Sequence, residues 1–183
     1  MRIAILNGNP SAEDAAFEGY LGGLAHALEE RRHEVTLLQL RDMDIKHCTG
    51  CWGCWVKTPG ECVAKDASAD VCRAAINADL VLHASPVIMG FYSALLKKAT
   101  DKLIPLVHPY LVVDQGEAHH LARYERYPLL GLLLQPGEDT DDEDIAIIRE
   151  IHSRTALNFK SRVAFAKLTS DPIEEVAREI DRL

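Results

Sequence analysis

The sequence lacks long apolar runs, an excess of basic residues and the two common glycine-rich nucleotide motifs. No stretch approaches the roughly 18 apolar residues of a membrane-spanning helix, so no membrane partner is expected. Lys and Arg number 20 against 28 Asp and Glu, giving a net charge of -8. Nucleic acid is therefore not an expected partner, because phosphate binding requires a basic face. G-x4-G-K and G-x-G-x-x-G are both absent, which excludes a nucleoside-triphosphate loop and argues against a dinucleotide fold.

A secretory leader is not expected either. The apolar stretch within residues 1–8 is short and carries no small-residue cleavage site. We therefore expect a reducing cytoplasm, where clustered cysteines act as ligands or redox thiols rather than structural disulfides. The length of 183 residues, 48% of them hydrophobic, predicts one globular domain over residues 1–183.

Apolar segments of two periods alternate along the chain. Short apolar runs predict strands at 2–7, 34–40, 79–84, 128–134 and 162–168. Helical spacing predicts helices at 14–31, 67–77, 93–106 and about 144–157, and a last helix capped by Asp171. Residues 41–66 are expected to form a cysteine-rich loop, and 109–127 an irregular segment. Alternating strands and helices predict an α/β three-layer sandwich with a five-stranded parallel sheet in the flavodoxin-like order 2-1-3-4-5.

Two loops lie where such sheets bind ligands, at the carboxyl ends of the first and third strands. Residues 7–16 lead into a helix N-terminus, which suits an anion. Residues 85–91 are mostly apolar, and Met89 and Phe91 can form walls beside a flat ring. The alternative is that both loops are ordinary strand-to-helix connections, so spacing alone leaves the assignment open.

The most specific pattern is a cluster of cysteines. Cys48, Cys51, Cys54 and Cys62 follow the spacing C-x2-C-x2-C-x7-C, with Gly50 and Gly53 between the first three. Glycines permit the sharp turns by which a loop wraps a metal group, and a cubane cluster binds four thiolates. The spacing therefore favours a [4Fe-4S] cluster on these four residues.

Other roles for these thiols remain open. Four thiolates also form a closed zinc site, although zinc ribbons usually carry two separated pairs. The thiols are otherwise unligated, or Cys51 and Cys54 form a redox pair. We expect Cys72 to be a small core residue and His47 to face solvent. His119 and His120 favour a lid or a subunit interface, with a plain surface loop as the alternative.

Three segments together resemble a known family. Residues 3–10 (IAILNGNP), the cysteine loop, and the stretch from Ser85-Pro86-Val87 to Lys97 look like the NAD(P)H-dependent FMN reductases and iron–sulfur flavoproteins. The resemblance implies a flavodoxin-like oxidoreductase with FMN, NAD(P)H as donor and a homodimer or homotetramer with flavin near the interface. It implies cofactor contacts from Asn7, Asn9, Pro10, Ser11, Ala16, Phe17, Pro86, Val87, Ile88, Met89, Gly90 and Phe91.

The phosphate loop departs from the family pattern. Members usually place hydroxyl or basic side chains there, whereas residues 11–16 read SAEDAA. Ser11 is the one hydroxyl, and Glu13 and Asp14 add negative charge.

The leading hypothesis is an FMN-dependent oxidoreductase that passes electrons through flavin, with or without the cluster, to a small-molecule or protein acceptor. No catalytic side chain is assigned, because the cofactor carries the chemistry. One alternative is a cluster-free NAD(P)H-dependent flavin or quinone reductase. The other is a non-enzymatic binding protein on the same scaffold that has lost flavin.

Overall fold

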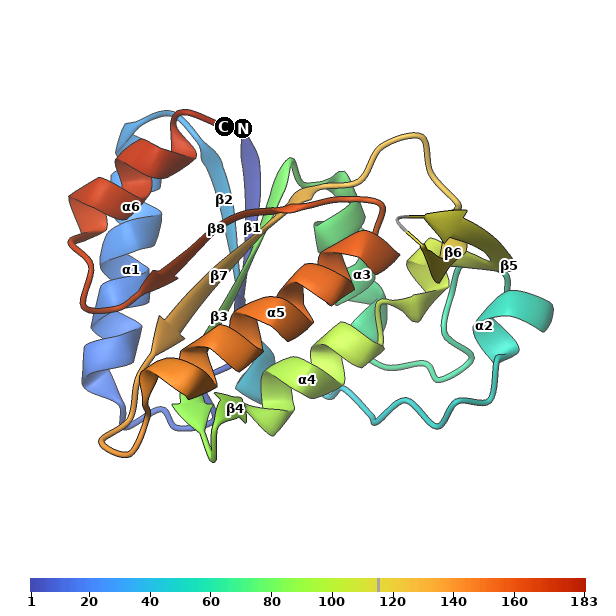
Figure 1. The fold of residues 1–183 in the computed structure, drawn as a ribbon, viewed down its shortest axis with the longest axis horizontal. Coiled ribbons are helices and arrows are strands. Elements are labelled where there is room, and N and C mark those ends of the chain that lie inside the picture. Colours follow the sequence, from blue (N-terminus) through green and yellow to red (C-terminus); the bar gives the residue numbers. More distant parts are fainter. Residues whose placement is uncertain (115) are drawn as a thin grey trace.

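The chain was analysed as a computed structural model that describes residues 1–114 and 116–183 (Figure 1). Its strands are β1 (Arg2–Asn7), β2 (Glu34–Gln39), β3 (Leu80–Ile88), β4 (Phe91–Tyr92), β5 (Val107–Asp114), β6 (Glu117–Ala122), β7 (Leu129–Gln135) and β8 (Val163–Leu168). Its helices are α1 (Ala15–Glu30), η1 (Leu40–Asp42), α2 (Gly53–Val56), α3 (Ser68–Asn77), α4 (Ala94–Asp101), η2 (Ile104–Leu106), α5 (Asp142–Asn158) and α6 (Ile173–Ile180). No helix of these described residues is both long and apolar enough to cross a bilayer.

Five strands of the central sheet are parallel to one another, in the order β2-β1-β3-β7-β8. The predicted α/β sandwich is confirmed, but the count of five strands is wrong. A sixth strand, β4, pairs antiparallel with the end of β3. The reversal occurs at Met89 and Gly90, whose φ angles are 52° and 73°. Two successive positive φ angles are the geometry of a tight hairpin turn, so most of the predicted loop at 85–91 is strand.

The segment predicted to be irregular is also a hairpin. Strands β5 and β6 form a separate antiparallel pair in which Val112 faces His119 and Val113 faces Ala118. The β-branched and apolar run from Tyr110 to Val113 carries the strand propensity that this prediction overlooked.

Alternate residues of each central strand feed two separate cores. Ile3 and Ile5 pack with Phe17 of α1 and Val176 of α6 on one face. Ala4 and Leu6 pack on the other face with residues of α3, α4 and α5. This two-residue alternation follows from the pleat of a strand. Figure 1 shows α1 and α6 on one side of the sheet, and α3, α4 and α5 on the other.

Two helix ends differ from their predicted form. Helix α6 begins at Ile173 with no side-chain cap. The predicted cap, Asp171, instead accepts a hydrogen bond from the backbone N–H of Leu168 at 2.9 Å. Helix α4 is shorter than predicted and ends at Asp101, ahead of the turn that carries Pro105. Proline lacks the N–H that a continuing helix needs.

Two histidines lie inside the core between β3 and α5. His83 and His152 are each 1% exposed, and their ring centroids are 4.9 Å apart. Both nitrogens of His83 and Nε2 of His152 have no hydrogen-bond partner among the described residues. Burial lowers the pKa of His83 well below its usual value, and the neighbouring His152 lowers it further. Burial also lowers the pKa of His152 to about 4, although a hydrogen bond with the Gly131 backbone opposes the shift.

This pair predicts a loss of stability in mild acid. The unfolded chain binds a proton on His152 near pH 6.5, whereas the folded chain resists protonation down to about pH 4. The unfolding free energy is therefore highest above about pH 6.5, and it falls as the pH drops from 6.5 towards 4. Between pH 6.5 and 5, urea denaturation of His152→Leu should show about 2 kcal/mol less loss of unfolding free energy than wild type. The exposed His26→Leu should keep the wild-type slope, and equal slopes for all three proteins would contradict the prediction.

Candidate functional site

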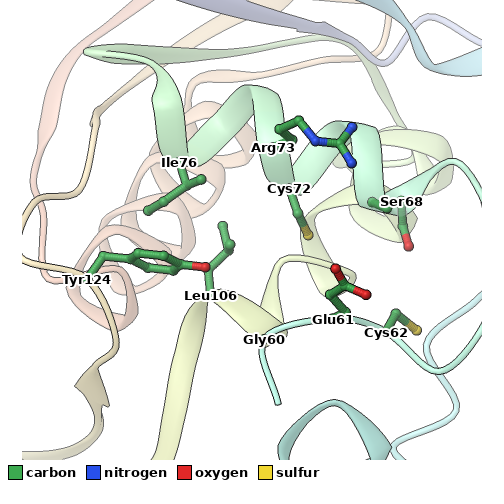
Figure 2. A pocket seen from close by; sticks show the side chains of 10 residues that line it. Gly60, Glu61, Cys62, Ser68, Cys72, Arg73, Ile76, Leu106 and Tyr124 are labelled. Carbon is green, nitrogen blue, oxygen red and sulfur yellow. The ribbon is translucent and has the colours of Figure 1, made fainter. Parts of the chain in front are cut away.

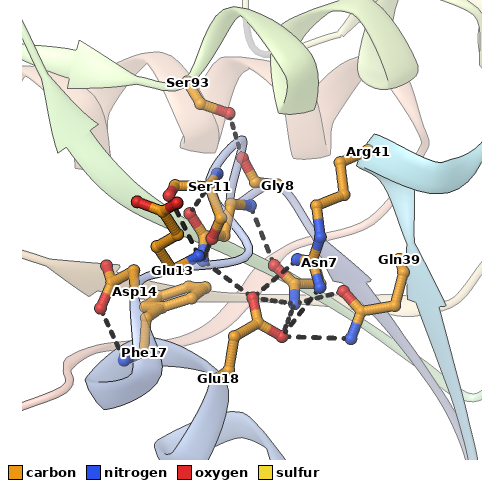
Figure 3. A network of polar contacts seen from close by, with 11 residues as sticks. Asn7, Gly8, Ser11, Glu13, Asp14, Phe17, Glu18, Gln39, Arg41 and Ser93 are labelled. Atoms are coloured by element: carbon orange, nitrogen blue, oxygen red, sulfur yellow. Dashed lines mark hydrogen bonds and ion pairs between the residues drawn. The ribbon is translucent and has the colours of Figure 1, made fainter.

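The loop after β1 is organised around one carboxylate, that of Glu18 in the first turn of α1 (Figure 3). Asn7 Nδ2 donates to both carboxylate oxygens at 3.1 Å, and Asn9 Nδ2 donates to Oε1 at 2.8 Å. Gln39 Nε2 and Arg41 Nη1 approach from the end of β2 and η1, at 3.2 and 2.8 Å. Side chains from two adjacent parallel strands therefore meet at their shared carboxyl edge on Glu18.

The network keeps Glu18 ionised. Burial alone would raise the pKa of Glu18, but hydrogen bonds from Asn7, Arg41, Asn9 and Gln39 lower it instead. Arg41 is largely buried against this carboxylate, with 19% of its side chain exposed. The guanidinium of Arg41 is thus already paired with a negative charge.

The rest of the loop offers little to a phosphate. Asn9 is buried, and its Oδ1 accepts from the backbone of Ser11 at 3.0 Å. The Asp14 carboxylate caps α1 by accepting from the N–H of Phe17 at 3.1 Å. Ser11 and Ala16 are exposed, whereas the Phe17 side chain is fully buried in the core. The predicted residues of this loop are uncharged, and the carboxylates of Glu13 and Asp14 beside them do not fit a phosphate dianion.

A second set of contacts ties this loop to the end of β3. Gly8 N–H donates to Ala84 O at 2.8 Å, and Ser93 Oγ donates to Gly8 O at 2.5 Å. Ser93 N–H donates in turn to Ser85 Oγ at 2.8 Å. A Cβ at Gly8 would lie 2.6 Å from Leu96 Cβ, so this approach requires glycine. The two predicted ligand loops are therefore joined at the switch point of the sheet.

The second predicted loop is built as the β3–β4 hairpin. Val87 is buried, whereas Ile88 is partly exposed and Met89 is 95% exposed. Glycine suits position 90 because its φ of 73° is a backbone conformation that other residues rarely adopt. Pro86 and Phe91 are half-buried on the two strands. The hairpin thus presents an apolar tip beside the loop of Asn7 and Asn9.

The four clustered cysteines line one cavity of about 150 Å³ between the loop around α2 and the η2 segment. Cys48 and Cys51 are exposed, Cys62 is half-buried and Cys54 is buried. Gly50 makes one sharp turn of the loop with a φ of 64°. The four cysteines that the spacing identified therefore line one cavity together.

The cysteines nevertheless do not form an assembled metal site. Within residues 1–114 and 116–183, no group of three or more His, Cys, Asp or Glu side chains is arranged to hold a metal ion. Burial raises the pKa of Cys54, with the neighbouring Cys62 as the next cause. Hydrogen bonding to the Gly53 backbone lowers the pKa of Cys51. The donors fit a four-thiolate group in chemistry and share a cavity, but their present geometry is not that of a closed ligand set.

A buried ion pair next to this cavity was not expected from the sequence. Lys102 Nζ lies 3.1 Å from Asp66 Oδ2, with side chains 3% and 0% exposed. The same ammonium donates to Cys62 Sγ at 3.0 Å. Burial raises the pKa of Asp66, but hydrogen bonds from Ser68, Lys46 and Lys102 outweigh it and lower the pKa to about 2. A charged pair 36 residues apart in sequence leaves no local pattern by which it might be found.

The fifth cysteine lies outside the cavity that the other four line, although it shares a neighbouring cavity with Cys62. Cys72 lines a second cavity of about 170 Å³ together with Glu61, Cys62 and Tyr124 (Figure 2). Its Sγ donates to Lys102 O at 3.2 Å, and burial raises its pKa to about 12. It packs against the core from α3, as predicted.

Aromatic rings connect the cysteine loop to the β5–β6 hairpin. Trp52 stacks on Trp55 with centroids 4.9 Å apart, and Trp55 lies 4.8 Å from the ring of His120. Trp55 Nε1 also donates to Val107 O at 2.9 Å. His119 lies buried on β6, where its Nδ1 is 3.1 Å from Asn158 Oδ1. The two histidines belong to a strand rather than to a surface loop, and His47 is exposed as expected.

Comparison with known sequences finds a family and two relatives. The profile of the family described as NADPH-dependent FMN reductase matches residues 1–118. An iron–sulfur flavoprotein of Archaeoglobus fulgidus is 28% identical over 102 residues, covering 56% of this chain and 48% of the relative. A second iron–sulfur flavoprotein of that organism is 29% identical over 157 residues, covering 74% of this chain and 70% of the relative. The first match thus spans about half the relative's length.

Solved structures share the fold. An FMN-dependent NADH-azoreductase from Bacillus anthracis, in complex with FMN, superposes with a TM-score of 0.68 at 13% identity, covering 98% of each chain. The apo form of an NADH:FMN oxidoreductase superposes with a TM-score of 0.61 at 15% identity, covering 99% of this chain and 87% of the other. At these identities the likeness shows a flavodoxin-like α/β fold.

The buried pair of Lys102 and Asp66 predicts an asymmetric response to substitution. Lys102→Met leaves the Asp66 carboxylate buried without its cation and should cost about 3 kcal/mol of unfolding free energy in urea denaturation. Lys97→Met breaks an exposed pair with Asp101 on the same helix and should cost less than about 1 kcal/mol. Adding Asp66→Asn to Lys102→Met should recover part of the loss. Equal costs for the two lysine variants would contradict the buried-pair account.

Proposed function

The chain belongs to the NADPH-dependent FMN reductase family, and on that premise we propose that it is a flavin-dependent oxidoreductase that takes electrons from NAD(P)H. The observation that carries this proposal is the joining of the two ligand loops at the switch point, where doubly wound sheets bind their ligands. Gly8, Ser85 and Ser93 hold those loops together. A bound flavin would supply hydride and one-electron chemistry that no side chain here supplies.

The family description names FMN as the flavin, and we propose that the isoalloxazine ring, which FMN and riboflavin share, lies against the two joined loops. The apolar hairpin tip at Ile88, Met89 and Phe91 suits a flat ring. Asn9 and Ser11 lie on the side of the site where the ribityl chain would end. One structural neighbour was solved in complex with FMN, which supports a flavin as the ligand of this fold.

We further propose that Cys48, Cys51, Cys54 and Cys62 hold a [4Fe-4S] cluster after the cysteine loop closes around it. The shared cavity of these cysteines supports this proposal, as does the description of both sequence relatives as iron–sulfur flavoproteins. A cluster would supply a one-electron path between flavin and an acceptor. The residues of this chain contribute the thiolates and, through Lys102, a hydrogen bond to one of them.

A cluster-free NAD(P)H-dependent flavin or quinone reductase is the second candidate. It is favoured by the absence of an assembled metal-binding group among the described residues. In both cases we propose a cytoplasmic protein, because none of the five cysteines forms a disulfide. A homodimer is the proposed assembly, and the exposed apolar side chains of Tyr110, Leu111 and Val113 are available for such contacts.

Reductase activity is tested directly on protein purified without oxygen. With NADPH or NADH, added flavin should accelerate nicotinamide oxidation, followed by the loss of absorbance of the reduced nicotinamide. The visible spectrum should show the two resolved bands of flavin once flavin is bound. A protein that binds neither FMN nor riboflavin and oxidises neither nicotinamide would refute the proposed function and favour a non-enzymatic binding protein.

The cluster is tested by removing its ligands. Replacing Cys48, Cys51, Cys54 and Cys62 together by Ala should abolish protein-bound iron and the broad brown absorbance that reductant bleaches. Cys72→Ala is the matched control and should retain both, because Cys72 lies outside the cysteine cavity. Metal analysis distinguishes iron from zinc. Wild-type protein without iron, with full flavin-dependent turnover in the fourfold variant, would establish the cluster-free candidate instead.

A further inference from the structure

Most backbone N–H groups at the start of α1, where a flavin phosphate would lie in the proposed site, already donate to groups of the protein itself. Backbone N–H groups at the start of a helix are the usual grip for such an anion. In residues 8–17, six of the nine N–H groups already donate within the chain: those of Gly8, Asn9, Ser11, Glu13, Ala15 and Phe17. Within the described part of the chain, those of Ala12, Asp14 and Ala16 remain without a partner.

The remaining N–H groups stand among carboxylates. Glu13 is exposed and Asp14 is half-buried. The free N–H of Ala12 is next to Glu13 in the chain, and another of the three free N–H groups is that of Asp14 itself. The Asp14 carboxylate already occupies the helix N-terminus by accepting from Phe17 N–H at 3.1 Å. A phosphate monoester carries close to two negative charges at neutral pH. Bringing it to this position places like charges side by side.

The cation and the amide donors at this edge of the sheet already bind another carboxylate, that of Glu18. Arg41 Nη1 lies 2.8 Å from Glu18 Oε1, and the amides of Asn7, Asn9 and Gln39 point at the same carboxylate. Figure 3 shows the side chains of Asn7, Gln39 and Arg41 converging on Glu18. Glu18 thus serves as an internal anion that takes up the polar donors of this edge.

Resting on the proposed function, we propose that this chain recognises flavin without a phosphate grip and binds riboflavin at least as tightly as FMN. Carboxylates accept hydrogen bonds and donate none when ionised. A chain of hydroxyl groups can donate to Glu13 and Asp14, whereas a phosphate dianion cannot. The preferred substrate or cofactor is therefore a flavin with a neutral polyol end, and Glu13 and Asp14 are the residues that set this specificity.

The wild-type test is equilibrium binding of riboflavin and of FMN, by quenching of flavin fluorescence, at about 20 mM and about 300 mM NaCl. We expect a dissociation constant for riboflavin equal to or below that for FMN. Salt should strengthen FMN binding relative to riboflavin, because it screens repulsion. FMN binding more than about tenfold tighter than riboflavin, and weakening with salt, would overturn the inference while leaving the proposed function intact. Failure of both flavins to bind would overturn both.

A double variant tests the assigned residues. Glu13→Lys with Asp14→Ser reverses the loop's charge and keeps a serine at the cap, which is a favoured capping residue. The ratio of FMN affinity to riboflavin affinity should rise at least about tenfold at low salt. Using a ratio cancels any general effect on the loop, and Glu18 is left in place because it anchors that loop.

The matched control places the same charge change at the far end of α1. Glu29 and Glu30 are exposed there, and Glu29→Lys with Glu30→Ser should leave the affinity ratio within about twofold of wild type. An equal rise in both double variants would show a long-range charge effect and overturn the assignment to Glu13 and Asp14. No rise in the loop variant would overturn it as well.

Discussion

The edge of the sheet where this protein's site lies depends on the carboxylate of Glu18. Asn7 ends β1, Gln39 ends β2 and Arg41 follows in η1, and all three donate to that one group. Because donors from separate segments share a single acceptor, the loop, the first helical turn and the neighbouring strand hold one another in place. A partly buried carboxylate with four donors is stable when ionised, so the loop conformation comes with a fixed negative charge.

The same device recurs beside the cysteines. There, the ammonium of Lys102 is buried against Asp66 and reaches Cys62 from the end of α4. Removing either partner leaves a charge in a region that cannot solvate it. In both places an ion pair between residues distant in sequence joins separate segments of the chain. They differ in charge: the ammonium-bearing Lys102 lines the cysteine cavity, whereas the loop at residues 11–16 carries the carboxylates of Glu13 and Asp14.

The parts of the fold that were predictable from the sequence are those that a local period determines. Apolar runs such as 2–7 and 162–168 locate buried strands, since nothing but burial accounts for them. The predictions failed where the local structure depends on more than the residue type and its sequence period. The turn at Met89 requires a positive φ at a non-glycine residue, which its identity does not signal. Asp171 accepts from Leu168 instead of capping α6, and the pairing of Lys102 with Asp66 has no sequence signature at all.

The sequence indicated two candidate ligand loops, at residues 7–16 and 85–91, but it did not indicate what these loops contact. The cysteine spacing identified residues that do share a cavity, because short spacing restricts where a loop can place them. The acidic character of residues 13 and 14 was also visible, but its consequence depended on Asp14 capping α1 and on Arg41 being occupied by Glu18. The tie between Gly8, Ser85 and Ser93 is independent of those charges. The contacts that join the two loops can therefore persist while the charge of residues 11–16 changes. The position that we propose for the flavin ring is then independent of whether the other end of the flavin carries a phosphate.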